Sequence, residues 1–304
     1  MSIKIKYSDD VLKAKELSRP VLALESTIIA HGMPYPENLD FAKKAESLCK
    51  EAGVSPATIA VIDGEIHVGL STEKMTTIAQ ASNIKKISMK DISVALSEKS
   101  SGATTVSSTA YIAKTSGIDV FATGGIGGVH RKTDITFDVS QDLIALSNTP
   151  IVVVSSGAKS ILDLPKTVEV LESLGVTTLG YKTSTFPSFY SRFSTANKIK
   201  KIETIDEIVD IFNFSRALKL KSAVLVANPV PKKNEIRHSK MEKIINKAIE
   251  DLDKTNISGK KVTPFLLKAV YKHTKGKSLK ANISLALNNV KIAAKIANCL
   301  HNKK

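Results

Sequence analysis

Two side chains with the chemistry of an acid and a nucleophile each follow a run of hydrophobic residues. Glu25 comes directly after Val21–Leu24, and Lys159 comes shortly after Ile151–Val154. A carboxyl group at the end of a buried strand acquires a raised pKa that suits a general acid or base, although such a group can equally cap a helix or pair with a lysine. Burial and a helix expected to start at Ser160 should lower the pKa of the Lys159 amine from about 10.4, giving a nucleophile able to form a Schiff base with a masked aldehyde. The alternative for Lys159 is a side chain whose ammonium group reaches water.

Small and hydroxyl-bearing residues between Ser101 and Thr109 open a predicted helix over Thr105–Ser116. The N-terminus of a helix presents free N–H groups and the positive end of its dipole, which together can bind an anion such as phosphate. Lys86, near the end of the short run Ile84–Ile87, would add a positive charge if it lies nearby. The simpler alternative is that a serine or threonine only caps the helix.

A glycine-rich segment, Ala122–His130, contains four glycines within five residues and follows the predicted strand Val120–Ala122. Glycines let the backbone approach a ligand closely and adopt positive φ angles, and the neighbouring histidine favours a site over a plain turn. The segment lacks the last glycine of the dinucleotide fingerprint, so a Rossmann cofactor site has little support. Gly157–Ser160 lacks the earlier glycine of a P-loop, which excludes a nucleoside triphosphatase of that class.

A further candidate site contains two carboxylates, Asp138 and Asp142, with Ser140 between them. If this segment is helical, residues four positions apart share one face. Carboxylate and hydroxyl oxygens suit a hard divalent ion such as Mg²⁺ or Mn²⁺. The alternative is that these acidic residues only stabilise the N-terminus of a helix.

The elements that must position these residues alternate between strands and helices over the first 230 residues. Continuous apolar runs are typical of strands buried on both faces of a parallel sheet, and the segments between them have the apolar spacing of helices. Ile62–Val68 predicts a hairpin because Asp-Gly readily adopts positive φ angles, so the sheet should be mixed. We therefore predict an α/β/α sandwich around a largely parallel (mixed) sheet, with ligands beyond the carboxyl ends of its strands. The predicted strands are Val21–Leu24, Ala57–Ile62, Val120–Ala122, Ile151–Val154, Thr177–Tyr181 and Ala223–Val226, and the predicted helices are Asn38–Ala52, Thr72–Ala81, Thr105–Ser116, Ser160–Leu174 and Ile205–Leu218.

A different pattern begins after Pro231, where only helices are predicted, over Arg237–Thr255, Thr263–Thr274 and Leu279–Asn302. We expect one domain over residues 1–304, with an α/β core at about 15–230 and additional C-terminal helices at 231–304. This last region holds 18 Lys and Arg against 5 Asp and Glu, which is most of the net charge of +15. An RNA-binding surface is one interpretation, but aromatic residues are only 5% and Trp is absent, so a solvated lysine-rich surface is preferred.

The overall composition is that of an ordinary globular protein, with 42% hydrophobic and 24% charged residues. Cys49 and Cys299 are too few for a disulfide framework or a four-thiolate zinc site, which favours a reducing compartment. The sequence shows neither a secretory signal nor an apolar run of the roughly 18 residues that cross a membrane. We expect a cytoplasmic protein without a membrane partner.

Taken together, several long motifs resemble the pseudouridine-5′-phosphate glycosidase family, and the resemblance covers essentially the whole chain. The family cleaves the C–C bond between C1′ of ribose 5-phosphate and C5 of uracil. The resemblance implies a homotrimer with an α/β/α core and a requirement for a divalent metal, typically Mn²⁺. The motifs are LESTIIAHGMPYPEN from Leu24, SGATTVSST from Ser101, VFATGGIGGVHR from Val120, TFDVSQDL from Thr136, SSGAKSILDLPKTVEVLESLGV from Ser155, VANPVP from Val226, and TPFLL with SLKANISLALNN from Thr263 onward.

The resemblance also implies roles for individual residues. Lys159 resembles the nucleophile that bonds to C1′, Glu25 resembles the proton donor, and Asp138 resembles the metal ligand. An amine suits this reaction because the leaving atom is carbon, for which the two carboxylates of ordinary glycosidases are insufficient. A sugar-phosphate aldolase or isomerase with a Schiff-base lysine is the alternative that shares Lys159. The positions expected to bind substrate are Lys86, Thr105, Val106, His130, Ser140, Gln141, Asp142 and Asn282.

Overall fold

The computed structural model describes residues 3–194, 198–255, 257 and 262–303. Its centre includes six neighbouring parallel strands, and the side chains of the inner ones are buried on both faces, as their continuous apolar sequences predicted. In spatial order these strands are β2 (Val21–Glu25), β7 (Val120–Ala122), β9 (Val152–Ser155), β13 (Val224–Ala227), β11 (Thr177–Tyr181) and β12 (Lys200–Ile202).

An extension beyond β2 makes the sheet mixed. The strand β3 (Ser55–Ile62) runs parallel to β2 but pairs antiparallel with β4 (Glu65–Val68). Asp63 and Gly64 connect β3 to β4 with φ angles of 50° and 72°, so the predicted hairpin and its positive φ angles are confirmed. The remaining strands of this extension are β1 (Ile5–Tyr7), β5 (Lys85–Ile87) and β6 (Gly102–Thr104).

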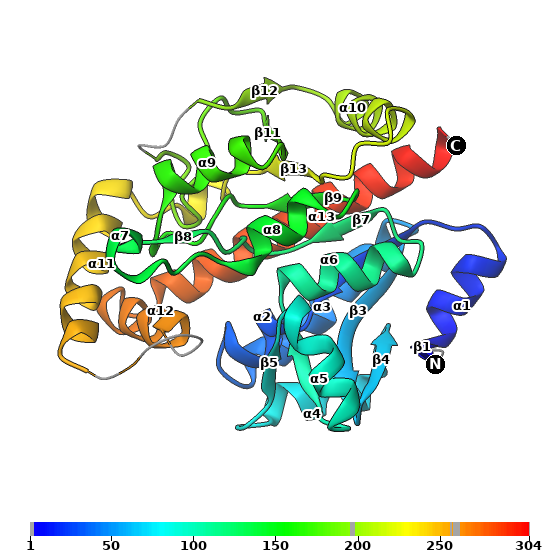
Figure 1. Cartoon of the computed structure of the whole chain (residues 1–304), viewed down its shortest axis with the longest axis horizontal. Coiled ribbons are helices and arrows are strands. Elements are labelled where there is room, and N and C mark those ends of the chain that lie inside the picture. Colours follow the sequence, from blue (N-terminus) through cyan, green and yellow to red (C-terminus); the bar gives the residue numbers. More distant parts are fainter. Residues whose placement is uncertain (1–2, 195–197, 256, 258–261, 304) are drawn as a thin grey trace.

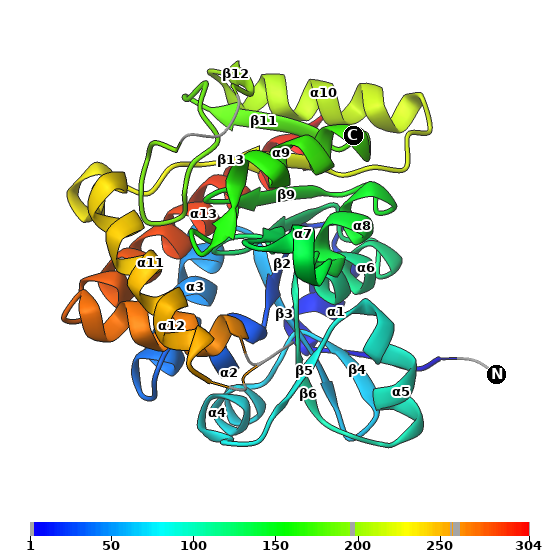
Figure 2. The same cartoon turned by 60° about the vertical axis from the view of Figure 1, so that its left-hand side comes forward.

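Helices cover both faces of the sheet (Figures 1 and 2), which confirms the predicted α/β/α sandwich. The helices α3 (Glu37–Glu51), α10 (Ile205–Ala217) and α13 (Lys277–Asn302) pack on one face. The helices α6 (Val106–Thr115), α8 (Gln141–Ser147) and α9 (Leu164–Ser173) pack on the other. The shorter helices are α1 (Asp9–Glu16), α2 (Thr27–His31), α4 (Thr72–Gln80), α5 (Ile92–Ser97) and α7 (Thr133–Thr136), with 3-10 turns at Met89–Asp91 and Lys232–Asn234.

The C-terminal region is helical as predicted, with α11 (His238–Asp253) and α12 (Val262–His273) packed against each other ahead of α13. Figure 1 shows α13 crossing beneath the parallel strands, and its Leu285, Val290 and Ile296 belong to the same hydrophobic cluster as those strands. The long last helix therefore forms part of one layer of the sandwich. Among the helices of the described residues, none combines the length and apolar character needed to cross a membrane.

Two local predictions are wrong. The helix expected from Ser160 begins at Leu164, because Asp163 accepts a hydrogen bond from the Lys166 N–H as its N-cap and is preceded by a short strand, β10 (Leu162–Asp163). That strand pairs antiparallel with β8 (Val129–His130). The expected helical face shared by Asp138 and Asp142 does not form either, because α8 begins only at Gln141.

Candidate active site

The carboxyl ends of β2, β7 and β9 meet at one cleft. Glu25 ends β2, Gly124 follows β7 and Lys159 follows β9, and all three line this cleft. Lys86 on β5 and Asn282 on α13 complete its polar wall. Glu25, Gly124 and Lys159 thus gather at the carboxyl ends of the parallel strands as predicted, and their binding of a ligand stays a prediction.

Glu25 is a buried carboxyl group, with 7% of its surface exposed. The Thr123 hydroxyl donates a hydrogen bond to its Oε1 atom from the end of the neighbouring strand. Burial raises the pKa of Glu25 because the ionised form loses its hydration, while the charge of Lys159 and the Thr123 hydrogen bond act in the opposite direction. A carboxyl group with a raised pKa, facing an amine in a cleft, has the properties of a general acid.

Lys159 lies on a loop, so the expected contribution of a helix N-terminus at this residue is wrong. The loop is held by backbone hydrogen bonds, since the Lys159 N–H donates to the Ile126 carbonyl at 3.1 Å and its carbonyl accepts from Leu162 at 3.0 Å. Gly157 has a φ of 72°, and a Cβ atom there would lie 2.0 Å from the Pro187 carbonyl oxygen. This turn therefore requires glycine, and the amine is presented to the cleft by rigid backbone.

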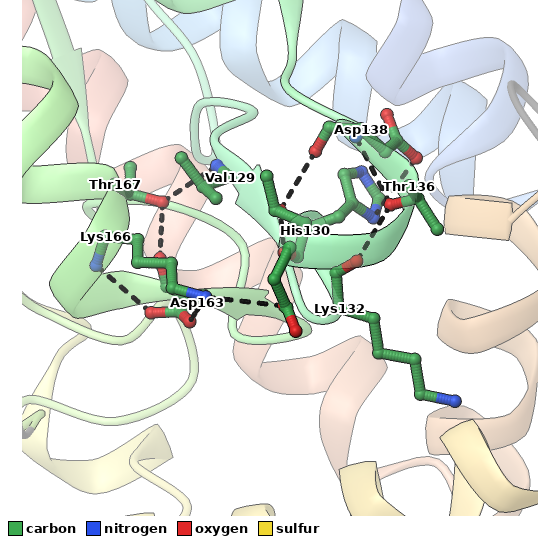
Figure 3. A network of polar contacts seen from close by, with 10 residues as sticks. Val129, His130, Lys132, Thr136, Asp138, Asp163, Lys166 and Thr167 are labelled. Carbon is green, nitrogen blue, oxygen red and sulfur yellow. Dashed lines mark hydrogen bonds and ion pairs between the residues drawn. The ribbon is translucent and has the colours of Figure 1, made fainter.

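The glycine-rich segment that follows β7 packs directly against side chains. A Cβ atom on Gly128 would lie 2.5 Å from the Thr167 hydroxyl oxygen. That hydroxyl accepts a hydrogen bond from the Val129 N–H at 3.0 Å and donates one to the Asp163 carbonyl at 2.6 Å, as Figure 3 shows. The close contact explains why glycine is needed here and links β8 to the start of α9.

Asp142 is buried and holds two segments of the site together. Its Oδ1 accepts the Ser107 N–H in the first turn of α6 at 2.9 Å, and its Oδ2 accepts the Gly127 N–H at 2.8 Å. One of the N–H groups that could have bound an anion at the start of α6 is therefore taken by a carboxylate of the protein. Thr105 is the N-cap residue of α6, and Val106 is its first residue.

Asp138 and His130 do not line this cleft. The Asp138 side chain is 42% exposed, and its Oδ2 lies 3.7 Å from Nδ1 of His130 (Figure 3). Burial and the charges of Lys159 and Lys86 lower the pKa of His130, and Asp138 opposes them. Among the described residues, no group of three or more His, Cys, Asp or Glu side chains is arranged to hold a metal ion. An exposed single carboxylate still fits Mg²⁺ or Mn²⁺, because such ions often keep several waters and bind through one or two carboxylates.

Ser140 and Gln141, which were also expected to bind substrate, make hydrogen bonds to nearby backbone N–H groups. Ser140 is the N-cap of α8, and its hydroxyl accepts the Asp142 N–H at 3.2 Å. The Gln141 Oε1 accepts the Lys90 N–H at 3.1 Å. Neither contact excludes a substrate, so their binding roles stay predictions.

Two features of the site were missed in the sequence. One is Thr123, which lies inside the glycine-rich motif but was not singled out. The other is Asn289, a fully buried amide on α13 that donates to the Thr123 carbonyl at 2.8 Å and accepts from the Asn228 amide at 2.9 Å. It also contacts the Ser156 hydroxyl, so it joins the ends of β7, β9 and β13 beneath the cleft. The available signal for Asn289 was its place on the apolar face of the helix predicted over Leu279–Asn302, where a polar side chain needs a buried partner.

Comparison with known proteins gives consistent results. The family model described as indigoidine synthase A like protein matches residues 10–299. The chain is 50% identical to the pseudouridine-5′-phosphate glycosidase of Thermosipho africanus, covering 96% of this chain and 98% of that protein. It is 44% identical to the enzyme of the same name from Staphylococcus aureus, covering 96% and 95%.

Two solved structures are also similar. The indigoidine synthase A-like protein of Thermotoga maritima superposes with a TM-score of 0.89 at 35% identity, covering 98% of this chain and 97% of that one. The prealnumycin C-glycosynthase AlnA in complex with ribulose 5-phosphate superposes with a TM-score of 0.91 at 33% identity, covering 100% and 99%.

Proposed function

Because the chain belongs to the pseudouridine-5′-phosphate glycosidase family and is an enzyme, we propose that it reversibly cleaves the C1′–C5 bond of pseudouridine 5′-phosphate to give uracil and ribose 5-phosphate. The observation that carries this proposal is the pairing of a buried acid, Glu25, with the Lys159 amine across one cleft. An acid alone would serve an oxygen leaving group, whereas the added amine suits the cleavage of a bond to carbon.

The amine and the acid divide the work of bond cleavage. The Lys159 nitrogen bonds to C1′ while the C1′–O4′ bond breaks, and O4′ takes the proton that Glu25 donates. The attached amine returns a proton to Glu25. The nitrogen lone pair then forms C1′=N as the C1′–C5 bond breaks, and C5 takes the proton from Glu25 to leave as uracil. Water hydrolyses the C1′=N bond, which frees ribose 5-phosphate and regenerates the Lys159 amine.

The phosphate of the substrate would bind toward Lys86 and the start of α6. Lys86 lines the same cleft as Lys159, and its charge reaches Glu25 and His130. The Val106 N–H and the Thr105 hydroxyl lie in the first turn of α6, where the helix dipole favours an anion. Binding energy from the phosphate would hold C1′ against the amine. His130, Asn282 and the segment Ser140–Asp142 are the remaining residues to which we assign substrate contacts.

Asp138 is the residue that would hold a divalent ion, for which we propose Mn²⁺. When bound, the ion would supply positive charge and ordered water beside the sugar. The buried Asp142 is not available as a second ligand without breaking its bonds to Ser107 and Gly127. We also propose, from the family, that the protein acts as a homotrimer in the cytoplasm.

A sugar-phosphate aldolase or isomerase is the second candidate. It is favoured by one observation, that a similar structure, AlnA, was solved with ribulose 5-phosphate. This reaction would use Lys159 and Lys86 in the same way but would not release a base. The two proposals therefore differ in whether uracil appears.

The test is ultraviolet detection of uracil released from pseudouridine 5′-phosphate with Mn²⁺ present. We expect turnover by the unchanged protein and its loss in Lys159→Ala and Glu25→Gln. Lys166→Ala is the matched control, since Lys166 lies on α9 in surface ion pairs with Asp134 and Asp163. No uracil from the unchanged protein, together with conversion of sugar phosphates alone, would favour the second candidate. Near-normal turnover by Lys159→Ala would refute the nucleophile assignment.

A further inference from the structure

A second cavity adjoins the active-site cleft. The two share five wall residues, which are His31, Gly32, Pro264, Leu267 and Asn282. We call the cleft that holds Glu25 and Lys159 the catalytic lobe, and the adjoining cavity the outer lobe. Resting on the function proposed above, we propose that the outer lobe is the passage through which the free base enters and leaves.

The outer lobe is large enough for such a ligand. It has a cavity volume of about 310 Å³, which lies at the lower end of the usual range of about 300–1,000 Å³ for small-molecule sites. Its remaining walls come from the start of α13 through Leu279, from α12 through Tyr271, and from the buried Tyr190.

The two lobes differ in charge, which assigns them to different parts of the substrate. Lys86 brings a positive charge to the catalytic lobe, so a phosphate dianion belongs there. Among the described residues that line the outer lobe beyond the shared wall, Lys268 is the only charged one, and it is exposed. An uncharged, planar base such as uracil suits this largely apolar and aromatic passage.

Polar atoms at the boundary between the lobes point to a ligand. Within the described part of the chain, His31 Nε2 and Asn282 Oδ1 are buried and have no hydrogen-bond partner. Buried polar groups are nearly always paired, so these two atoms are placed to bind something that the protein itself does not supply. Burial and the charge of Lys86 lower the pKa of His31, so its ring is neutral. A neutral ring nitrogen and an amide oxygen can together bind the adjacent N–H and C=O groups of uracil.

The proposed chemistry explains why the base needs a route that the sugar phosphate does not occupy. Once the C1′–C5 bond has broken, the sugar stays attached to Lys159 and occupies the catalytic lobe. The base must then leave before water reaches C1′. The outer lobe begins at the wall that it shares with the catalytic lobe, at Pro264 and Leu267 of α12, and so offers the base a way out.

The test narrows the outer lobe without touching the catalytic residues. Lys268→Trp fills its mouth from an exposed position on α12, and Leu279→Trp fills it from α13. Lys272→Trp is the matched control, because Lys272 is also exposed on α12 but does not line either lobe. Circular dichroism confirms that each variant is folded.

Two readouts distinguish passage of the base from binding of the sugar phosphate. The first is exchange of labelled uracil into pseudouridine 5′-phosphate, and the second is borohydride trapping of ribose 5-phosphate on the protein with no uracil present. Both narrowing variants should slow uracil exchange by about tenfold, as expected when release of a product becomes limiting, while trapping stays at the level of Lys272→Trp. Equal losses in both readouts, or no loss in exchange, would overturn the passage. Absence of exchange and trapping in the unchanged protein would refute the proposed function itself.

Discussion

Replacing Asn289 with alanine should remove the buried support beneath the cleft. The substitution leaves two groups without partners, the Thr123 carbonyl and one N–H of the Asn228 amide. Within the described residues, Asn289 is the only donor that reaches the Thr123 carbonyl. The Ser156 hydroxyl keeps its bond to the Asn228 carbonyl, and the Gly124 carbonyl keeps the Ser156 N–H, so these two groups stay satisfied.

The expected magnitude follows from that count. Each buried polar group left unpaired costs about 1–3 kcal/mol, so Asn289→Ala should lower the free energy of unfolding by about 2–6 kcal/mol. That is a large part of the total of about 5–15 kcal/mol typical of a folded protein. Uracil release should fall as well, because Thr123 is the residue that donates to Glu25.

The assay is urea unfolding followed by circular dichroism at one fixed protein concentration, since assembly would otherwise change the apparent stability. Asn288→Ala is the matched control, because Asn288 is the adjacent residue on the same helix and is only half-buried. The control should change stability by no more than about 0.5 kcal/mol. If both variants unfold at the same urea concentration, the structural role assigned to Asn289 is wrong.

Three further substitutions test other contacts. Burial raises the pKa of Glu25, so the unfolded chain ionises this group first, near pH 4.3, and the stability of the folded protein falls as the pH rises from there through the folded pKa. Glu25→Gln should therefore gain stability relative to the unchanged protein between pH 4 and pH 8, as measured by urea unfolding. An equal difference in stability at both pH values would contradict a raised pKa of Glu25. Gly128→Ala should lower the free energy of unfolding by about 1–3 kcal/mol, because its Cβ would overlap Thr167, and Thr167→Ala in the same chain should restore part of that loss. Arg131→Lys loses the two-point ion pair with Glu242 and should lower the free energy of unfolding, measured by urea unfolding. Glu242→Gln added to Arg131→Lys should lower it little further in a double-mutant cycle, and additive losses would show that the two residues act separately.

The sheet and the meeting of Glu25 with Lys159 could be predicted because both depend on local patterns. Continuous apolar runs identify buried parallel strands, and the carboxyl ends of such strands lie at one edge. Residues at the ends of β2 and β9 therefore had to lie at the same edge of the sheet once the strands were identified, and the structure places β7 alone between the two strands. The cleft position of Lys86 is different, since it depends on β5 pairing with β6, which the short run Ile84–Ile87 does not reveal.

The errors arose where capping residues decide the start of a helix. Apolar spacing after Lys159 suggested a helix from Ser160, but Asp163 followed by Pro165 is a stronger start signal and was overlooked. In the same way, Ser140 caps α8 and leaves Asp138 outside it.

Long-range contacts could not be read from the sequence at all. Asp142 bonds to Ser107 and Gly127 from a separate helix, and Asn289 reaches three strand ends from the last helix. No periodic pattern encodes these pairings, because each depends on how the layers pack.

The central claim is that the Lys159 amine forms a covalent bond with C1′ of the sugar. The most direct measurement is borohydride reduction of the protein in the presence of ribose 5-phosphate, followed by mass spectrometry of its peptides. We predict one stable adduct, on the peptide that contains Lys159, and none in Lys159→Ala. An unmodified Lys159 peptide from a protein that releases uracil, or an adduct on a different lysine, would contradict the mechanism.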